Sequence, residues 1–169
     1  QGDHFQITEL DGTPAPHSPG GPKFLIGGGG RRVLKFAAAN VDIVGVNASI
    51  HSGEIDSAAA ADGAPERIDE KVGWVRDGAG DRWDDLEINA WLAAAEVTND
   101  PGPVADFLGE LFGVEPAEAL ASPLVLVGSP ASIAETLAER RERWGYSYHV
   151  IPHDEARAFA PIVAALTGT

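Results

Sequence analysis

The sequence contains no cysteine, no methionine and few basic residues. Without cysteine the chain has no disulfide, no thiolate metal ligand and no cysteine nucleophile. Its 12 Lys and Arg stand against 26 Asp and Glu, a formal net charge of −14. This balance argues against nucleic-acid binding, because phosphate backbones are held by clustered basic side chains. Without methionine the chain has no start residue, so we expect a processed chain, a piece of a longer protein or the ordered part of one.

Long apolar runs and targeting segments are also lacking. No apolar stretch reaches the ~18 residues that a membrane helix needs. The first residues, Gln1-Gly2-Asp3-His4, lack the basic and apolar regions of a signal peptide. We therefore expect no membrane partner and a cytoplasmic location. The five histidines show no spacing typical of a metal site, so we expect no metal.

The 169 residues are enough for one domain with a substantial core. Residues 1–22 are rich in Pro and Gly and predict an irregular lead-in, in which only 4–7 favour a short strand. Beyond it, apolar strands alternate with helical patterns, which is typical of a parallel sheet with helical crossovers. The predicted fold class is α/β, either an open doubly wound sheet or part of an eight-stranded barrel. Four strands are expected at 23–26, 43–46, 86–92 and 146–151, with helices at about 31–40, from 65, from 100, 130–144 and 155–166.

Four consecutive glycines follow the first predicted strand. They are Gly27, Gly28, Gly29 and Gly30, and the helical segment that begins with Arg31-Arg32 comes directly after them. Glycine lets another group approach the backbone closely, and a helix begins with unpaired N–H groups. The pattern therefore predicts a site for a phosphate or another anion, the alternative being a tight turn without a ligand.

Polar residues follow the second predicted strand. Asn47 and Ser49 lie at its carboxyl end, where parallel α/β folds place their ligands. The alternative role for these two residues is to cap the following segment. His51 lies just beyond, and a lone loop histidine is usually only solvated.

Two blocks a hundred residues apart resemble a known family. The first covers 26–34, with the glycine run and Arg31-Arg32-Val33-Leu34, and the second covers 126–135, with Leu126-Val127-Gly128-Ser129-Pro130. Together with 140–151, they are similar to the C-terminal half of the luciferase-like oxidoreductases of the bacterial luciferase superfamily. More specifically, they resemble a branch of that family that uses the deazaflavin coenzyme F420. The resemblance extends from about His4 to Leu166.

Members of this family are TIM-type (β/α)8 barrels roughly twice as long as this chain. The resemblance therefore implies that 23–169 form strands 5–8 with their helices, and that the first half of the barrel is missing. It implies a cofactor-binding role for Gly27, Gly28, Gly29, Gly30, Asn47 and Ser49. The groups that act on substrate lie largely on early strands in this family, so the catalytic residues are unknown.

The resemblance implies an oxidoreductase, or the C-terminal portion of one. It would transfer a hydride between coenzyme F420 and a small organic substrate. The same phosphate cradle suits FMN, so an FMN-dependent luciferase-like monooxygenase is the nearest alternative. An alternative of another class is a non-catalytic half-barrel that self-associates. Its partner would be the missing N-terminal half-barrel or a second copy in a dimer, because open strand edges and apolar faces drive pairing.

Overall fold

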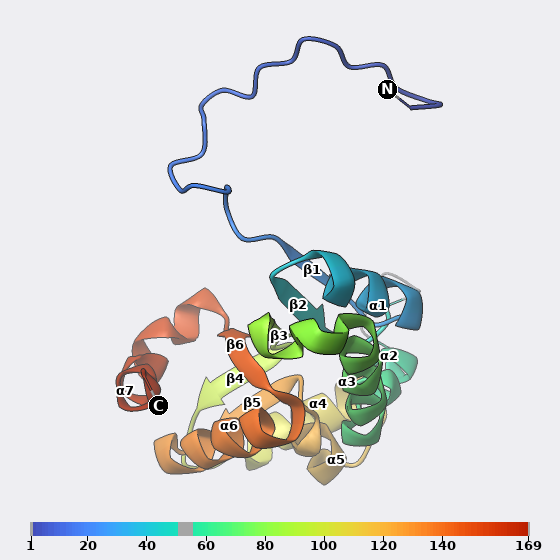
Figure 1. The fold of residues 1–169 in the computed structure, drawn as a ribbon. Coiled ribbons are helices and arrows are strands. Elements are labelled where there is room, and N and C mark those ends of the chain that lie inside the picture. The colour runs from blue at the N-terminus through green and yellow to red at the C-terminus, as the bar shows by residue number, and fades with distance from the viewer. Residues whose placement is uncertain (1, 51–55, 169) are drawn as a thin grey trace.

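The structure, a computed structural model, describes residues 2–50 and 56–168. Residues 2–22 contain no helix or strand and extend away from the body as an arm (Figure 1). The strand that the sequence favoured at 4–7 is therefore absent. The elements of the body, in chain order, are β1 (Leu25–Gly28), α1 (Arg31–Asn40), β2 (Ile43–Val46), α2 (Ser57–Asp62), α3 (Pro65–Ala79), a 3₁₀ turn (Gly80–Asp85), β3 (Glu87–Trp91), β4 (Ala94–Val97), α4 (Gly102–Phe112), α5 (Pro116–Ala121), β5 (Val125–Gly128), α6 (Pro130–Trp144), β6 (Tyr146–Val150), a second 3₁₀ turn (His153–Glu155) and α7 (Ala156–Leu166).

The main sheet has four strands in the order β1-β2-β3-β6, and every neighbouring pair is parallel. Each crossover between these strands contains at least one helix. This confirms the predicted parallel α/β fold. All four strands therefore end at the same edge, where the loops that follow them gather.

Two further strands, β4 and β5, pair with each other in parallel and were not predicted. The chain changes neighbours between β3 and β4: the Leu92 N–H donates to the Val150 carbonyl, and the next N–H, of Ala93, donates to the Leu124 carbonyl. The prediction of only four strands was wrong because these segments show no alternation. β5 is a short continuous apolar run, which periodicity cannot distinguish from part of a buried helix.

The core lies between one face of the main sheet and the helices α1, α3 and α6. Alternation places Val44, Val46, Ile88 and Ala90 on this face, where they are buried. The other face, which we call the inner face, is open in part, since Ile43 and Asn89 on it are buried. On it Leu25, Trp91, Tyr148 and Val150 remain 38–45% exposed. In the part of the chain that the structure describes, the helices of this core pack against the opposite face.

Helix α6 is tied to β5 through a buried arginine. Its N-cap Ser129 accepts from the Ser132 N–H, and the helix ends at Gly145 with φ 77°, as the sequence predicted. Within the helix, the Arg140 guanidinium donates to the carbonyls of Pro123 at 3.0 Å and Val125 at 2.6 Å. Burial lowers the pKa of Arg140 to about 10. The buried cation is thus satisfied entirely by backbone oxygens.

Within the described part of the chain, no helix is both long and apolar enough to cross a membrane.

We predict that Arg140→Met lowers the free energy of unfolding by about 3 kcal/mol, because it leaves buried carbonyls without donors. The control is Arg157→Met on α7, where the side chain is exposed and the expected change is within about 0.5 kcal/mol. Urea unfolding followed by circular dichroism measures both. Equal stabilities for the two variants would show that the buried arginine does not anchor β5.

Candidate functional site

The glycine run is divided between strand and turn. The sequence predicted a strand at 23–26 and a turn from Gly27 to Gly30, but β1 extends through Gly28. The shift has a packing reason, since Gly27 lies opposite Gly45 of β2. A Cβ on Gly45 would come within 3.0 Å of the Gly27 Cα, so the two strands approach closely at this point. Only Gly29 and Gly30 form the turn.

The last two glycines of the run have different surroundings. A Cβ on Gly29 would lie 2.5 Å from the Ser49 nitrogen and 2.7 Å from the Ala48 carbonyl carbon. The turn after β1 and the loop after β2 are therefore in direct contact, which only glycine permits here. A Cβ on Gly30 would meet nothing within 4 Å, and Gly30 is exposed. Packing within the chain gives no reason for glycine at this position.

The open space at Gly30 adjoins the start of α1. Gly30 is the N-cap of this helix and provides no side-chain cap, and the first turn contains no acidic residue. The helix begins instead with the exposed Arg31 and Arg32. Free N–H groups, the positive end of the helix dipole and two guanidinium groups together favour an anion.

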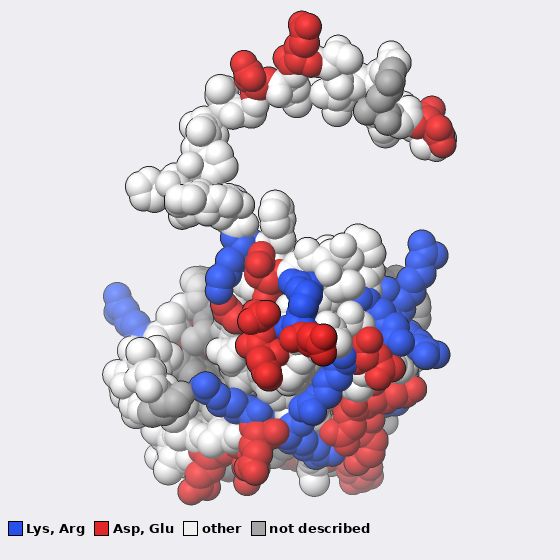
Figure 2. All heavy atoms as spheres, viewed as in Figure 1, with Lys and Arg blue, Asp and Glu red and all other residues white. Residues whose placement is uncertain are grey.

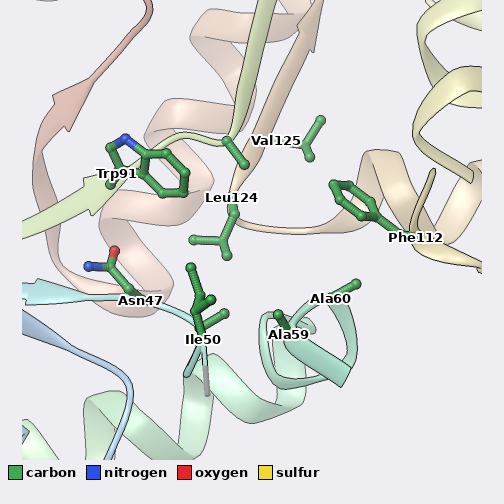
Figure 3. A pocket seen from close by; sticks show the side chains of 10 residues that line it. Asn47, Ile50, Ala59, Ala60, Trp91, Phe112, Leu124 and Val125 are labelled. Atoms are coloured by element: carbon green, nitrogen blue, oxygen red, sulfur yellow. The ribbon is translucent and has the colours of Figure 1, made fainter. Parts of the chain in front are cut away.

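Asn47 connects the turn to a small cavity. Its backbone N–H donates to the Gly28 carbonyl at 3.0 Å. Its side-chain Oδ1 is buried and has no hydrogen-bond partner among the described residues. In Figure 3 the Asn47 side chain stands across from Trp91 at the edge of an apolar cavity. The cavity measures about 30 Å³, roughly the volume of one water molecule, so it admits no ring system.

A buried lysine of α3 binds the loop that follows β2. Lys71 is fully buried in α3, and its Nζ donates to the Asn47 carbonyl at 2.9 Å. The same nitrogen donates to the Asp62 carboxylate at 2.6 Å and to the Asp62 carbonyl at 2.8 Å. The other contact of Asp62 Oδ2 is the backbone N–H of Ser49, at 2.8 Å. One ammonium and one carboxylate thus fix both ends of the segment from 47 to 49.

The pKa values of Lys71 and Asp62 are both shifted in this ion pair. Burial lowers the pKa of Lys71, against the raising effect of Asp62. Partial burial tends to raise the pKa of Asp62, but hydrogen bonds from Lys71, the Ser49 N–H and Arg67 lower it to about 2. Arg67 donates to the second Asp62 oxygen from Nε and Nη2, at 3.1 and 3.0 Å. The carboxylate therefore stays ionised throughout the physiological range.

The structure places the sequence-predicted residues differently from one another. Gly27 and Gly28 lie in β1 and are beside Asn47, since a Cβ on Gly27 would lie 3.2 Å from Asn47 Nδ2 and the Gly28 carbonyl accepts from the Asn47 N–H. Gly29 contacts the loop further on, at Ala48 and Ser49, and Gly30 faces open space. Ser49 is next to Gly29, but its N–H is already engaged by Asp62, so only its hydroxyl remains for a ligand. His51 lies outside the described residues.

Sequence reasoning missed Lys71 and Asp62. A signal was present for the lysine, because it lies on the apolar side of α3 beside Ile68, Val72 and Val75, where a charge requires a buried partner. The described residues contain no cluster of His, Asp and Glu suited to a metal ion. On the face shown in Figure 2, Lys and Arg side chains are interspersed with acidic ones, so no broad basic surface forms.

No family model matches the chain, and no curated protein matches its sequence. Among solved structures, it is similar to a coenzyme F420-dependent tetrahydromethanopterin reductase from Methanopyrus kandleri, with a TM-score of 0.52 and 16% identity. The match covers 79% of this chain and 45% of the reductase. At this identity the likeness shows a shared fold, and the chain spans less than half of that structure.

A second similar structure is the oxygenating constituent of 3,6-diketocamphane monooxygenase from the CAM plasmid of Pseudomonas putida, a type II Baeyer-Villiger enzyme in complex with FMN. Its TM-score is 0.43 at 13% identity, over 83% of this chain and 45% of that one. At that TM-score the likeness supports no conclusion.

The Asp62 ion pair predicts a pH dependence of stability. The folded-state pKa of Asp62 is about 2, below its ordinary value of 3.8, so its contribution is complete above pH 4 and is lost as the pH falls toward 2. We expect the wild type to lose about 2 kcal/mol more than Asp62→Asn over this interval. Urea unfolding at pH 4 and pH 2 measures the difference. The control Asp106→Asn, at an exposed position, should follow the wild type, and an Asp62→Asn profile parallel to both would contradict the assignment.

Proposed function

We propose that this chain is the C-terminal half of a luciferase-like (β/α)8 barrel, and that it holds the tail of coenzyme F420 in an oxidoreductase. The observation that carries the proposal is the contact between the Gly29–Gly30 turn and the loop from Asn47 to Ser49. This contact lies at the carboxyl edge of a parallel sheet, beside an uncapped helix N-terminus. The fold shared with an F420-dependent reductase supports the choice of cofactor.

The residues present fit such a cofactor. F420 and FMN both carry a polyhydroxyl chain that leads to a phosphate group. The N–H groups at the start of α1, beside Gly30, would hold the phosphate, and Arg31 and Arg32 would add positive charge. The unpartnered Oδ1 of Asn47 would accept a hydrogen bond from a hydroxyl group of the cofactor's polyhydroxyl chain. When bound, the cofactor supplies the hydride chemistry.

The chain's own residues bind and orient the cofactor. Lys71 and Asp62 keep the loop from 47 to 49 in place, so the acceptor of Asn47 is preorganised. The cavity beside Trp91 is too small for a tricyclic ring. A bound ring would therefore need further strands over the inner face to exclude water. No catalytic residue is assigned to this chain.

FMN is the nearest alternative within the same fold. A phosphate cradle alone does not distinguish the two cofactors, because each carries a phosphate at the end of its polyhydroxyl chain. The spectrum of the bound cofactor does, since the deazaflavin absorbs at about 420 nm and the flavin elsewhere. The cytoplasmic location expected from the sequence remains a prediction.

A non-catalytic half-barrel that self-associates is the candidate of another class. The open inner face favours it, with Trp91 and Tyr148 each 40% exposed. A cofactor titration separates the two proposals. The oxidoreductase requires binding of F420 or FMN, and the purely structural half-barrel requires neither.

We predict that Gly30→Glu weakens F420 binding at least about tenfold, because its carboxylate takes the position of the phosphate at the N-terminus of α1. Its stability should be unchanged, since a Cβ at Gly30 meets nothing within 4 Å. The control Gly12→Glu makes the same change in the arm, where a Cβ also meets nothing. Fluorescence titration with F420 measures all three proteins. Equal affinities for both variants would refute the proposed phosphate site, and a wild type that binds neither F420 nor FMN would refute the proposed function.

A further inference from the structure

Two large grooves lie outside the candidate site. One, between α6 and α7, includes four consecutive residues of β6 and adjoins the side of that strand that is unpaired among the described residues, where further strands of the barrel would lie. The other measures about 540 Å³ and is lined by residues of β4, β5, α4 and the loop that follows β6, and we call it the α4 groove. Every residue that lines the α4 groove lies outside the four strands of the main sheet. Pairing of further barrel strands with β1 or β6 therefore does not by itself fill it.

The α4 groove has an apolar wall that is open to solvent. Val104, Phe107 and Leu108 line it from α4. Leu108 is buried in the cluster that anchors the helix, but Phe107 is 62% exposed. Leu111, one turn further along the helix, is 55% exposed. Packing within the chain gives no reason for these two large side chains at the surface, and exposed apolar patches of this kind mark interaction sites.

Carboxylates line the same groove. They belong to Glu96, Asp154 and Glu155. Glu155 accepts from the Val97 N–H at 3.4 Å, and within the described part of the chain none of the three forms an ion pair. The surrounding sequence offers no cation either, since residues 83–139 contain eleven Asp and Glu but no Lys or Arg. The α4 groove thus combines an exposed apolar wall with uncompensated negative charge.

We propose that the α4 groove binds a short basic segment of a partner protein, in which a large apolar side chain is flanked by Lys or Arg. The apolar side chain packs against Val104 and Phe107, and the basic side chains meet Glu96 and Glu155. An aromatic side chain surrounded by polar groups that exclude water is the usual arrangement of an interface hot spot. The carboxylates add specificity and speed the encounter with a cationic partner.

Charge distinguishes this occupant from the others. A second copy of this chain has a net charge of −14, so its approach would bring like charges together. Nucleic acids and membranes with anionic headgroups are disfavoured for the same reason. The inference goes beyond the proposed function and is independent of the cofactor, because Gly30 and Asn47 lie outside the α4 groove.

Fluorescence anisotropy with a synthetic peptide tests the inference on the full chain. The probe is a fluorescein-labelled peptide of about twelve residues built from Leu and Lys, and a second probe has Glu in place of every Lys. At an ionic strength of about 0.15 M, where long-range attraction between exposed charges is screened, we expect saturable binding of one Lys peptide per chain. The Glu peptide should not bind.

Two pairs of matched variants locate the binding. Phe107→Ser should weaken binding of the Lys peptide at least about tenfold, whereas Phe36→Ser on α1, where the ring is 58% exposed, should leave it unchanged. Glu96→Gln should weaken binding about threefold. Glu135→Gln on α6 makes the same change in net charge at an exposed position and should have no effect. Circular dichroism should show all four variants folded.

Four results would each overturn the inference. They are a Lys peptide that does not bind, a Glu peptide that binds equally well, a Phe107→Ser variant that binds as tightly as Phe36→Ser, and a Glu135→Gln variant weakened as much as Glu96→Gln. The last would show attraction to the net charge of the chain alone. Failure of the chain to bind F420 or FMN would leave these expectations unchanged.

Discussion

The structure depends on one constraint, which is that a purely parallel sheet needs cover on both of its faces. Helices α1, α3 and α6 bury one face against Val44, Val46 and Ile88, and leave parts of the inner face exposed. The same parallel order brings the ends of β1 and β2 to one edge, where the glycine turn meets the loop after β2. The parallel order of the strands thus underlies both features, the candidate site at one edge and the partly exposed inner face.

Within the site, close backbone contact and buried charge act together. The missing side chain of Gly29 lets the loop at Ser49 lie against the turn, and Lys71 with Asp62 holds that loop from the opposite side. A buried ammonium is costly unless it is fully paired, and here three oxygens accept from it. The arrangement leaves open space beside Gly30, and the Asn47 Oδ1 has no hydrogen-bond partner among the described residues.

The sequence predicted those parts of the fold that have local chemical signals. Helix α6 was foreseen from Ser129-Pro130 at its start and Gly145 at its end, because caps and left-handed glycines act within a few residues. β4 and β5 were not predicted, because a short apolar run is identified as a strand only by the strand with which it pairs. The extension of β1 to Gly28 depends on contact with Gly45, and the role of Lys71 on a partner nine residues away. Such contacts are tertiary. The helical pattern of α3 signals that Lys71 needs a buried partner, but it does not identify that partner.

The central claim is that the start of α1 and the loop after β2 hold the anionic tail of a deazaflavin. The most direct measurement is a map of amide chemical shifts from an isotope-labelled chain titrated with F420. The account predicts the largest, saturable shifts at Gly29–Val33 and at Asn47, with small shifts along α4 and α5. Shifts confined to the groove between α6 and α7, or spread without a focus, would contradict it.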